Sequence, residues 1–349
     1  HYSNVQNSLR LVYNLRFGAN DVLTLGADYL HDYLYNKNLD GKTRKQDAFD
    51  AFAQYDWNIR QNLELVGALR YDYFSDHHFS HLTPKVSLRY EPLAYMNLRL
   101  GYGMGFRAPT LKEKYYEFDM AGIWVVVGNP NLKAEVSHNF NLSAEYARGG
   151  YNFTLNGYYN HITNKIATGA PYLVKPTDPI PHLSYINLAA HSVVGMEAAV
   201  QGHWRNGLSA RLAYTLTAEN LPRNKAGERM SAQYIPARKH SLMVHADWEH
   251  RFHKNFGMTL GIDGRYLSGV TNPEYIDYYD ISKGMRDIEY PGYTLWKLSV
   301  AGQFKKGVKV TLALDNLFNY RPKYYYLNSP LTDGINVMLG VSIDIDKLF

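Results

Sequence analysis

The sequence predicts an all-β protein, a transmembrane antiparallel β-barrel. Three observations lead to this prediction. Apolar and polar residues alternate along most of the chain, which is typical of strands with one apolar face. The alternating segments are about ten to fifteen residues long, whereas strands of soluble proteins have about five or six. Aromatic residues such as Tyr33, Tyr35, Tyr71 and Tyr73 gather near segment ends, as in the aromatic girdles of transmembrane barrels.

The alternation marks about fifteen strands. In the segment 255–268, for example, Phe256 and Leu260 belong to the apolar set, whereas Asp263 and Arg265 belong to the polar set. Long strands of this kind satisfy all their backbone hydrogen bonds in lipid only when they close into a barrel. The predicted strands are 4–17, 20–36, 44–58, 61–74, 82–91, 95–105, 135–147, 150–164, 190–203, 207–219, 238–251, 255–268, 290–304, 307–316 and 334–347.

The connections between these strands alternate in length. Tight turns such as 17–20 and 147–150 occur at every second connection, and longer loops lie between them. Short turns on one side and long loops on the other are typical of outer-membrane barrels, in which the long loops are extracellular. The predicted long loops are 37–43, 75–81, 106–134, 165–189, 220–237, 269–289 and 317–333.

The composition excludes several other classes of protein. The 349 residues include no cysteine, which excludes a disulfide scaffold. There is no run of roughly eighteen apolar residues, which excludes a transmembrane helix. The net charge of +5 is spread along the chain, without the Lys/Arg blocks that indicate nucleic-acid binding. Because phosphate-binding, HExxH and GxSxG motifs are also absent, we expect a protein that is not an enzyme.

The strand count predicts that this barrel is incomplete. Bacterial barrels have an even number of strands, and an open set of about fifteen would leave an unprotected edge. The sequence also starts at His1 rather than at Met. We therefore expect residues 1–349 to be the C-terminal part of a single transmembrane β-barrel domain.

The segment 106–135 interrupts the alternation. It begins with Phe-Arg-Ala-Pro at 106–109 and ends shortly after Asn-Pro-Asn-Leu at 129–132. We expect an irregular extracellular loop, and loops of about thirty residues are often functional. The two tetrads resemble the paired boxes of TonB-dependent outer-membrane receptors. The stretch LDNLFNYRPKYY at 314–325 resembles the segment before the last strand of those receptors.

This resemblance implies a protein of the bacterial outer membrane that actively imports a scarce nutrient. Receptors of the family have barrels of about 22 strands and an N-terminal plug, whose TonB box contacts the inner-membrane energy transducer TonB. The plug and the TonB box are absent from this sequence, as are about seven strands. We expect TonB, the lipid bilayer and a surface lipoprotein as partners. The alternative outside the family is a passive porin-like barrel.

The resemblance also suggests a ligand. In the family, the paired boxes are associated with receptors for haem and haemoproteins, so haem is the lead transported ligand, and we expect no intrinsic cofactor. A histidine between the boxes often ligates haem iron in those receptors, and this sequence has none there. Tyr115 or Tyr116 would then supply a phenolate ligand. Cobalamin and ferric siderophores are the alternatives, because their receptors carry the same boxes.

The candidate site residues lie in the predicted long loops. Arg107 would bind acidic groups of a ligand or pair with a lumenal carboxylate such as Asp263 or Glu145. Aromatic loop residues indicate a planar ligand, a partner protein or packing among the loops. Loop histidines suit iron or another metal, or they form a solvated loop tip. The candidates are Arg107, Tyr115, Tyr116, Trp124, Asn129, Asn131, Tyr324 and Tyr325 for ligand binding, and His77, His78 and His81 for a metal.

Overall fold

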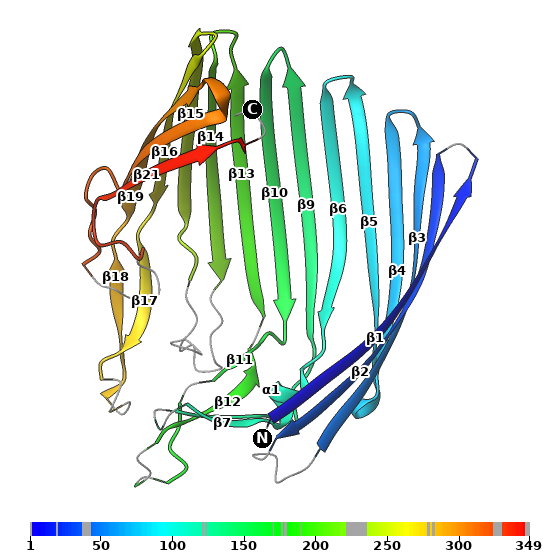
Figure 1. Cartoon of the computed structure of the whole chain (residues 1–349). Coiled ribbons are helices and arrows are strands. Elements are labelled where there is room, and N and C mark those ends of the chain that lie inside the picture. Colours follow the sequence, from blue (N-terminus) through cyan, green and yellow to red (C-terminus); the bar gives the residue numbers. More distant parts are fainter. Residues whose placement is uncertain are drawn as a thin grey trace.

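Fifteen long strands form one antiparallel sheet (Figure 1). The computed structural model describes residues 2–18, 20–36, 43–120, 122, 124–169, 171–175, 177, 180–188, 190–220, 236–277, 280, 283–323 and 330–345. The predicted fold class and all fifteen predicted strands are confirmed, with boundaries that differ by four residues or fewer. In order across the sheet, the strands are β1 (Tyr2–Phe17), β2 (Asp21–Asn36), β3 (Thr43–Arg60), β4 (Leu63–Phe74), β5 (Phe79–Leu93), β6 (Met96–Arg107), β9 (Glu135–Arg148), β10 (Tyr151–Thr163), β13 (His191–His203), β14 (Leu208–Asn220), β15 (His240–His253), β16 (Phe256–Leu267), β19 (Tyr293–Phe304), β20 (Val308–Asp315) and β21 (Asn336–Ile343).

The sheet curls into an open trough with two different ends (Figure 1). Tight turns join the strands at one end, which we call the turn end and which is uppermost in the view. Longer connections lie at the other end, the loop end. In the turn between β9 and β10, Gly149 and Gly150 have φ angles of +63° and +85°. Glycine adopts this left-handed conformation without the steric penalty of other residues, which explains the tight reversal.

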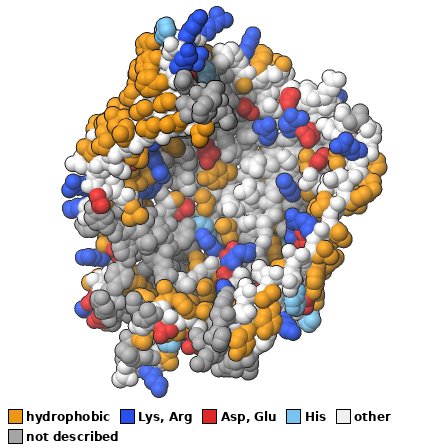
Figure 2. Space-filling view, in the orientation of Figure 1, with side chains coloured by type: hydrophobic (Ala, Val, Ile, Leu, Met, Phe, Trp, Pro, Cys, Tyr) orange, Lys and Arg blue, Asp and Glu red, His pale blue; other side chains and the backbone are white. Residues whose placement is uncertain are grey.

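The two faces of the sheet differ in chemistry, as the alternation predicts. Charged side chains lie across the hollowed face (Figure 2). Charged pairs between neighbouring strands include Arg10 with Asp28 at 2.7 Å and Arg70 with Asp50 at 2.9 Å. On the opposite face, apolar side chains such as Leu142 remain 61% exposed. Membrane-spanning barrels expose an apolar outer surface to lipid and keep polar groups inside.

The long connections contain regular structure that the alternation did not predict. The expectation of an irregular loop at 106–134 is wrong in part, because this segment forms a short helix and two short strands. Their backbone groups bond to one another and to the next long connection, which period-2 alternation does not reveal. The additional elements are α1 (Leu111–Tyr115), β7 (Glu117–Asp119), β8 (Val125–Val127), β11 (Ile166–Thr168), β12 (His182–Asn187), the hairpin of β17 (Val270–Tyr275) and β18 (Met285–Tyr290), and the 3-10 helix η1 (Asp76–His78).

The four short strands form a second sheet at the loop end, in the order β11-β12-β8-β7. β8 pairs in parallel with β12, so the connection after β6 is hydrogen-bonded to the connection after β10. This sheet lies beside α1 below the barrel wall (Figure 1). Within the described residues, no helix is both long enough and apolar enough to cross a membrane.

Candidate functional site at the loop end

A hollow of about 470 Å³ lies at the loop end, where the two ends of the connection after β6 meet. We call these ends its first corner, at 108–109, and its second corner, at 128–134. Pro109 and Pro130 line it from the two corners, and Phe74 and Phe79 line it from β4 and β5. Concave sites with apolar walls and a few polar groups are typical of small-molecule binding. We call this feature the mouth hollow.

The helix α1 lies next to the mouth hollow, and the residues at its start determine where it begins. The Oγ1 atom of Thr110 accepts a hydrogen bond from the Glu113 backbone N–H at 3.2 Å, and Glu113 Oε2 accepts one from the Thr110 N–H at 2.8 Å. This reciprocal capping box satisfies two amides that a helix start leaves unpaired. Pro109, which precedes the cap, has no N–H and cannot extend the ladder of β6. The sequence Pro-Thr-x-x-Glu therefore ends the strand and starts the helix.

An apolar contact, an ion pair and a hydrogen bond fix the helix α1 to the barrel rim. Leu111, only 2% exposed, packs in a buried cluster with Leu34, which is fully buried. The Nζ atom of Lys114 lies 2.5 Å from Asp76 Oδ2, and the Lys114 side chain is 5% exposed. The hydroxyl of Tyr115 donates a hydrogen bond to the other Asp76 oxygen at 3.1 Å. Because a buried charge is costly without a partner, this pairing holds the helix to the connection after β4.

Tyr115, a predicted haem ligand, lies in an environment that raises the pKa of its phenol. Burial raises the pKa of the Tyr115 phenol, and the adjacent Asp76 carboxylate raises it further. The Arg44 guanidinium, 4.4 Å from the centre of the ring, only partly opposes this rise. The phenol acts here as a hydrogen-bond donor to Asp76, and its role as a haem ligand stays a prediction.

Arg107 connects both corners of the loop at the end of β6. Its Nη1 atom donates to Glu113 Oε1 at 2.9 Å, and its Nη2 atom donates to Glu135 Oε1 at 2.7 Å. The same Glu135 oxygen accepts a hydrogen bond from the Ile166 amide at 2.7 Å. One planar guanidinium thus makes charge-assisted hydrogen bonds to two carboxylates at once. A lysine could not reproduce this arrangement. One arginine thus fixes α1, the start of β9 and the connection after β10.

The Arg107 partners differ from the carboxylates that the sequence suggested, Asp263 and Glu145. Glu145 lies towards the turn end of β9, where its carboxylate is 3.7 Å from Arg99. Asp263 lies on β16 and bonds to His245 Nδ1 at 2.7 Å. The pairing with Glu113 depends on the helix α1, which the alternation pattern did not predict, whereas the pairing with Glu135 follows from the register of β6 with β9.

The second corner of the loop returns through Gly128 and Asn129. The Asn129 amide donates to the Tyr185 carbonyl at 2.8 Å, and its Oδ1 atom accepts from the Asn131 N–H at 3.0 Å. A Cβ atom at position 128 would lie 2.6 Å from the backbone nitrogen of Tyr115. Only glycine therefore allows the returning chain to pass this close to α1.

Asn187 joins the two long connections that surround the mouth hollow. Its Oδ1 atom accepts a hydrogen bond from the Lys133 N–H at 2.8 Å. Its Nδ2 group donates to the Lys133 carbonyl at 2.8 Å and to the Asn164 carbonyl at 2.7 Å. Buried or partly buried backbone groups in loops need such partners, and this side chain satisfies three of them.

The remaining ligand-binding candidates lie at different distances from the mouth hollow. Asn131 lines it, whereas Tyr116 and Trp124 are not among its lining residues. The ring of Tyr116 stacks on Phe118 with 5.9 Å between centroids, and Trp124 is half-buried. The segment 324–329, which includes two candidate tyrosines, lies outside the described residues.

The three candidate metal ligands follow β4 and start β5. His78 Nδ1 lies 3.0 Å from the Tyr73 hydroxyl, and His81 stacks on Phe106 with 4.6 Å between ring centroids. The side chain of His77 lies outside the described part of the structure. Among the described side chains, no group of three or more His, Cys, Asp and Glu residues is suited to hold a metal ion. The histidine metal site stays a prediction.

Sequence reasoning missed several residues that build this site. The pair Thr110 and Glu113 carried a recognisable signal, because Ser or Thr followed three residues later by Glu predicts a helix start. Asp76, Gly128 and Asn187 carried none, since each acts through segments that are distant in the sequence.

Comparisons with known proteins agree with this architecture. Residues 1–317 match the protein family described as TonB dependent receptor-like, beta-barrel. The chain is 23% identical over 336 residues to the iron-regulated outer membrane virulence protein of Vibrio cholerae serotype O1, and 23% identical over 351 residues to the ferric enterobactin receptor of Pseudomonas aeruginosa. The structure resembles that of the siderophore receptor PirA from Pseudomonas aeruginosa, with a TM-score of 0.72 at 19% identity.

These matches cover nearly all of this chain but only about half of each relative. The alignments span 92% of the chain and 49% of the Vibrio protein, and 88% of the chain and 44% of the enterobactin receptor. The superposition covers 97% of this chain and 56% of PirA. At 19% identity, the structural likeness establishes the fold alone.

Proposed function

The chain belongs to the TonB-dependent receptor β-barrel family, and from this premise we propose that it serves in a receptor that imports a ferric siderophore. Receptors of this family lie in the bacterial outer membrane, and so does this chain. The observation that carries the proposal is the similarity to the ferric enterobactin receptor over 88% of the chain. A ferric siderophore was an alternative ligand in the sequence-based prediction, and these relatives favour it over haem.

The mouth hollow has suitable chemistry for such a ligand. Complexes of iron with catecholate siderophores combine aromatic rings with negative charge. Phe74 and Phe79 offer aromatic surface, and aromatic pairs add to the stabilisation from burial. Arg44 and Lys133 are exposed at the same end, and Lys133 lines the hollow. These cations would attract an anionic ligand and form charge-assisted hydrogen bonds with it.

The haem hypothesis has less support. Its candidate tyrosine ligands were Tyr115 and Tyr116, and the Tyr115 hydroxyl donates a hydrogen bond to Asp76. None of the three relatives reported above is named for haem. The match to the receptor family gives a porin-like barrel no support, and none of the same three relatives is named for cobalamin, so we propose the siderophore.

We further propose that TonB supplies the energy for import. In this scheme the loop end binds the ligand, and the inner-membrane transducer acts on the plug that the resemblance implies. A surface lipoprotein partner stays a prediction. Loop-end binding and TonB action are separable, because binding requires no energy source whereas uptake does.

Binding to the purified full-length protein tests the ligand. We expect ferric enterobactin to quench tryptophan fluorescence saturably, and the double substitution Arg44→Glu and Lys133→Glu to weaken binding about tenfold or more, since each reversed contact removes roughly 1 kcal/mol. The matched control is Lys254→Glu, which reverses a charge at the turn end. Equal affinity of the loop-end and control variants would contradict a site at the mouth hollow.

Competing ligands are tested in the same assay. Haem binding would produce a shift of the Soret absorption band. Added cobalamin is expected to displace no siderophore from the proposed site. If ferric enterobactin and other ferric siderophores fail to bind while haem or cobalamin binds tightly, the siderophore proposal is wrong. Uptake of radioactive iron by cells with and without TonB then tests the energy source separately.

A further inference from the structure

The lipid-facing side of the wall contains a hollow of about 380 Å³ near the turn end. It arises from the register of three neighbouring strands. Leu155 on β10 stands opposite Ala144 on β9 and opposite Ala198 on β13. The two alanines leave space on both sides of the leucine, since all three side chains belong to the apolar face of the sheet. We call this feature the wall hollow.

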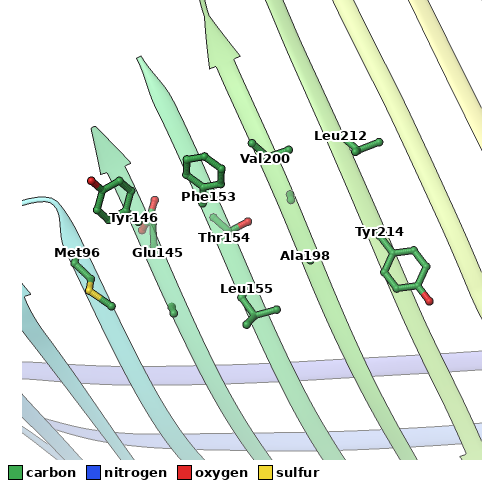
Figure 3. Close-up of a pocket in the computed structure, with 12 residues that line it drawn as sticks. Met96, Glu145, Tyr146, Phe153, Thr154, Leu155, Ala198, Val200, Leu212 and Tyr214 are labelled. Atoms are coloured by element: carbon green, nitrogen blue, oxygen red, sulfur yellow. The ribbon is translucent and has the colours of Figure 1, made fainter. Parts of the chain in front are cut away.

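Larger side chains close the wall hollow towards the turn end. Phe153 stands opposite Tyr146 on one side and Val200 on the other. Figure 3 shows these side chains with Leu155 and Tyr214 around the depression. The lining is almost entirely apolar, so a hydrocarbon chain fits its chemistry, whereas a polar ligand would lose hydrogen bonds there.

A cation stands at the turn-end edge of the wall hollow. The Arg148 guanidinium lies over the ring of Tyr95, 4.8 Å from its centroid. Tyr95 in turn meets Tyr146, a lining residue, edge to face at 5.2 Å between centroids. A continuous surface therefore runs from the apolar wall hollow through two tyrosines to an exposed positive charge.

Arg148 is available to an outside anion. Among the described residues, no carboxylate lies within ion-pair distance of it, although other arginines of the wall are paired, such as Arg89 with Glu64 at 2.7 Å. Nearby, the Trp204 indole donates to the Tyr151 hydroxyl at 3.0 Å. Tryptophan and tyrosine favour the boundary between lipid and water, which places Arg148 at the depth of lipid headgroups.

We propose that the wall hollow and Arg148 form a binding site for one phospholipid of the inner leaflet of the outer membrane. One acyl chain fills the wall hollow between Ala144 and Ala198, and the phosphate binds the Arg148 guanidinium. The turn end faces the periplasm in barrels of this kind, so the inner leaflet is the one within reach. Cationic groups at the membrane surface attract anionic lipid headgroups, and the apolar space selects a chain to accompany the phosphate.

Native mass spectrometry of the purified full-length protein in mild detergent tests this site. The protein is titrated with dioleoyl phosphatidylglycerol and, in parallel, with dioleoylglycerol, which has the same chains but no phosphate. We expect the phospholipid to bind about fivefold or more tightly than dioleoylglycerol, since one arginine near the surface contributes roughly 1 kcal/mol. Arg148→Ala should remove this preference, and Arg148→Lys should retain most of it.

Two further variants distinguish the contribution of the Arg148 charge from that of the apolar space in the wall hollow. Ala198→Phe fills the wall hollow and should reduce the affinity for both lipids by about tenfold, because a buried chain loses several CH₂ groups of contact. Arg205→Ala removes a different arginine at the turn end and should change neither affinity. Barrel folding is checked by the heat-dependent mobility of each variant in gel electrophoresis. Equal binding of the two lipids, or wild-type binding by folded Ala198→Phe, would overturn the proposal.

Discussion

Arg107 and Glu135 stand opposite each other at the last rung between β6 and β9, with 2.7 Å between the guanidinium and the carboxylate. The same carboxylate accepts the amide of Ile166, so this pair joins the barrel rim to two long connections at once. The pair occurs where the regular pairing of β6 with β9 ends. Specific side chains therefore help to hold the loops at the mouth, together with the backbone pairing of β8 with β12.

Replacing Arg107 with alanine should loosen the loops without unfolding the barrel. The change leaves Glu113 and Glu135 without their shared cation, and hydrogen bonds to charged groups contribute about 1.5–3 kcal/mol each. We expect local stability at the Ile166 amide to fall by about 2 kcal/mol, measured by hydrogen exchange. Siderophore affinity should fall as well, because loops that must be ordered on binding lower the affinity.

The matched control for this change is Arg99→Ala, which removes an arginine of the same strand. Its distance of 3.7 Å to Glu145 indicates a weaker pair, and it lies towards the turn end. Exchange at Ile166 should stay as in the wild type. A similar loss of protection in both variants would show that Arg107 has no special role at the mouth.

Replacing Gly128 with alanine should disrupt the packing of the returning chain on α1. The added methyl group would lie 2.6 Å from the Tyr115 nitrogen and 2.7 Å from the Lys114 carbonyl oxygen. Because backbone atoms cannot rotate away, we expect a local destabilisation of about 1–3 kcal/mol. Limited proteolysis of the connection after β6 measures the effect. The control is Gly157→Ala on β10, where a methyl group meets no atom within 4 Å.

Replacing Lys114 with methionine should detach α1 from the connection after β4. The substitution keeps the length of the side chain but removes the Lys114 ammonium group from Asp76, whose side chain is only 17% exposed. Removing one partner of a buried ion pair costs about 3–5 kcal/mol, so we expect a local loss near the lower value. Hydrogen exchange of α1 measures it, with Lys133→Met at an exposed position as the control. Unchanged protection of α1 would mean that the ion pair of Lys114 with Asp76 does not hold the helix.

The barrel was predictable from the sequence, and much of the mouth was not. Alternation places Leu142 and Glu145 on opposite faces of β9 without any knowledge of their partners, because the strand period fixes both. No comparable period links Asn129 to Tyr185 or Asp76 to Lys114. These contacts arise between connections that are distant in sequence, and they depend on how the loops fold over the rim.

The first corner shows the limit of motif recognition. The tetrad Phe-Arg-Ala-Pro lies where β6 ends and the long connection begins, and the candidate Arg107 lies at the rim. Its partners Glu113 and Glu135 were missed, although Glu113 completes a capping box with Thr110 that local sequence rules predict. A search for helix starts inside the loop would have found Glu113, whereas Glu135 required the pairing of β6 with β9.

Alkaline pH should release α1 through Tyr115. Burial, assisted by Asp76, raises the pKa of this phenol above its ordinary value of about 10. A group whose pKa is higher in the folded state than in the unfolded state stabilises the fold fully at pH values below the unfolded pKa. This stabilisation is lost as the pH rises through the folded pKa. We expect the docking of α1 to be constant near neutral pH and to weaken above about pH 10.

Fluorescence of Trp124 during an alkaline titration measures this release, because Trp124 lies in the same connection as α1. Tyr115→Phe removes both the titrating group and the hydrogen bond to Asp76, so the variant should be somewhat less stable at neutral pH and should show a smaller alkaline change. Tyr90→Phe, on the apolar face of β5, is the control and should titrate like the wild type. An alkaline transition of equal size in Tyr115→Phe would show that another group controls the loop.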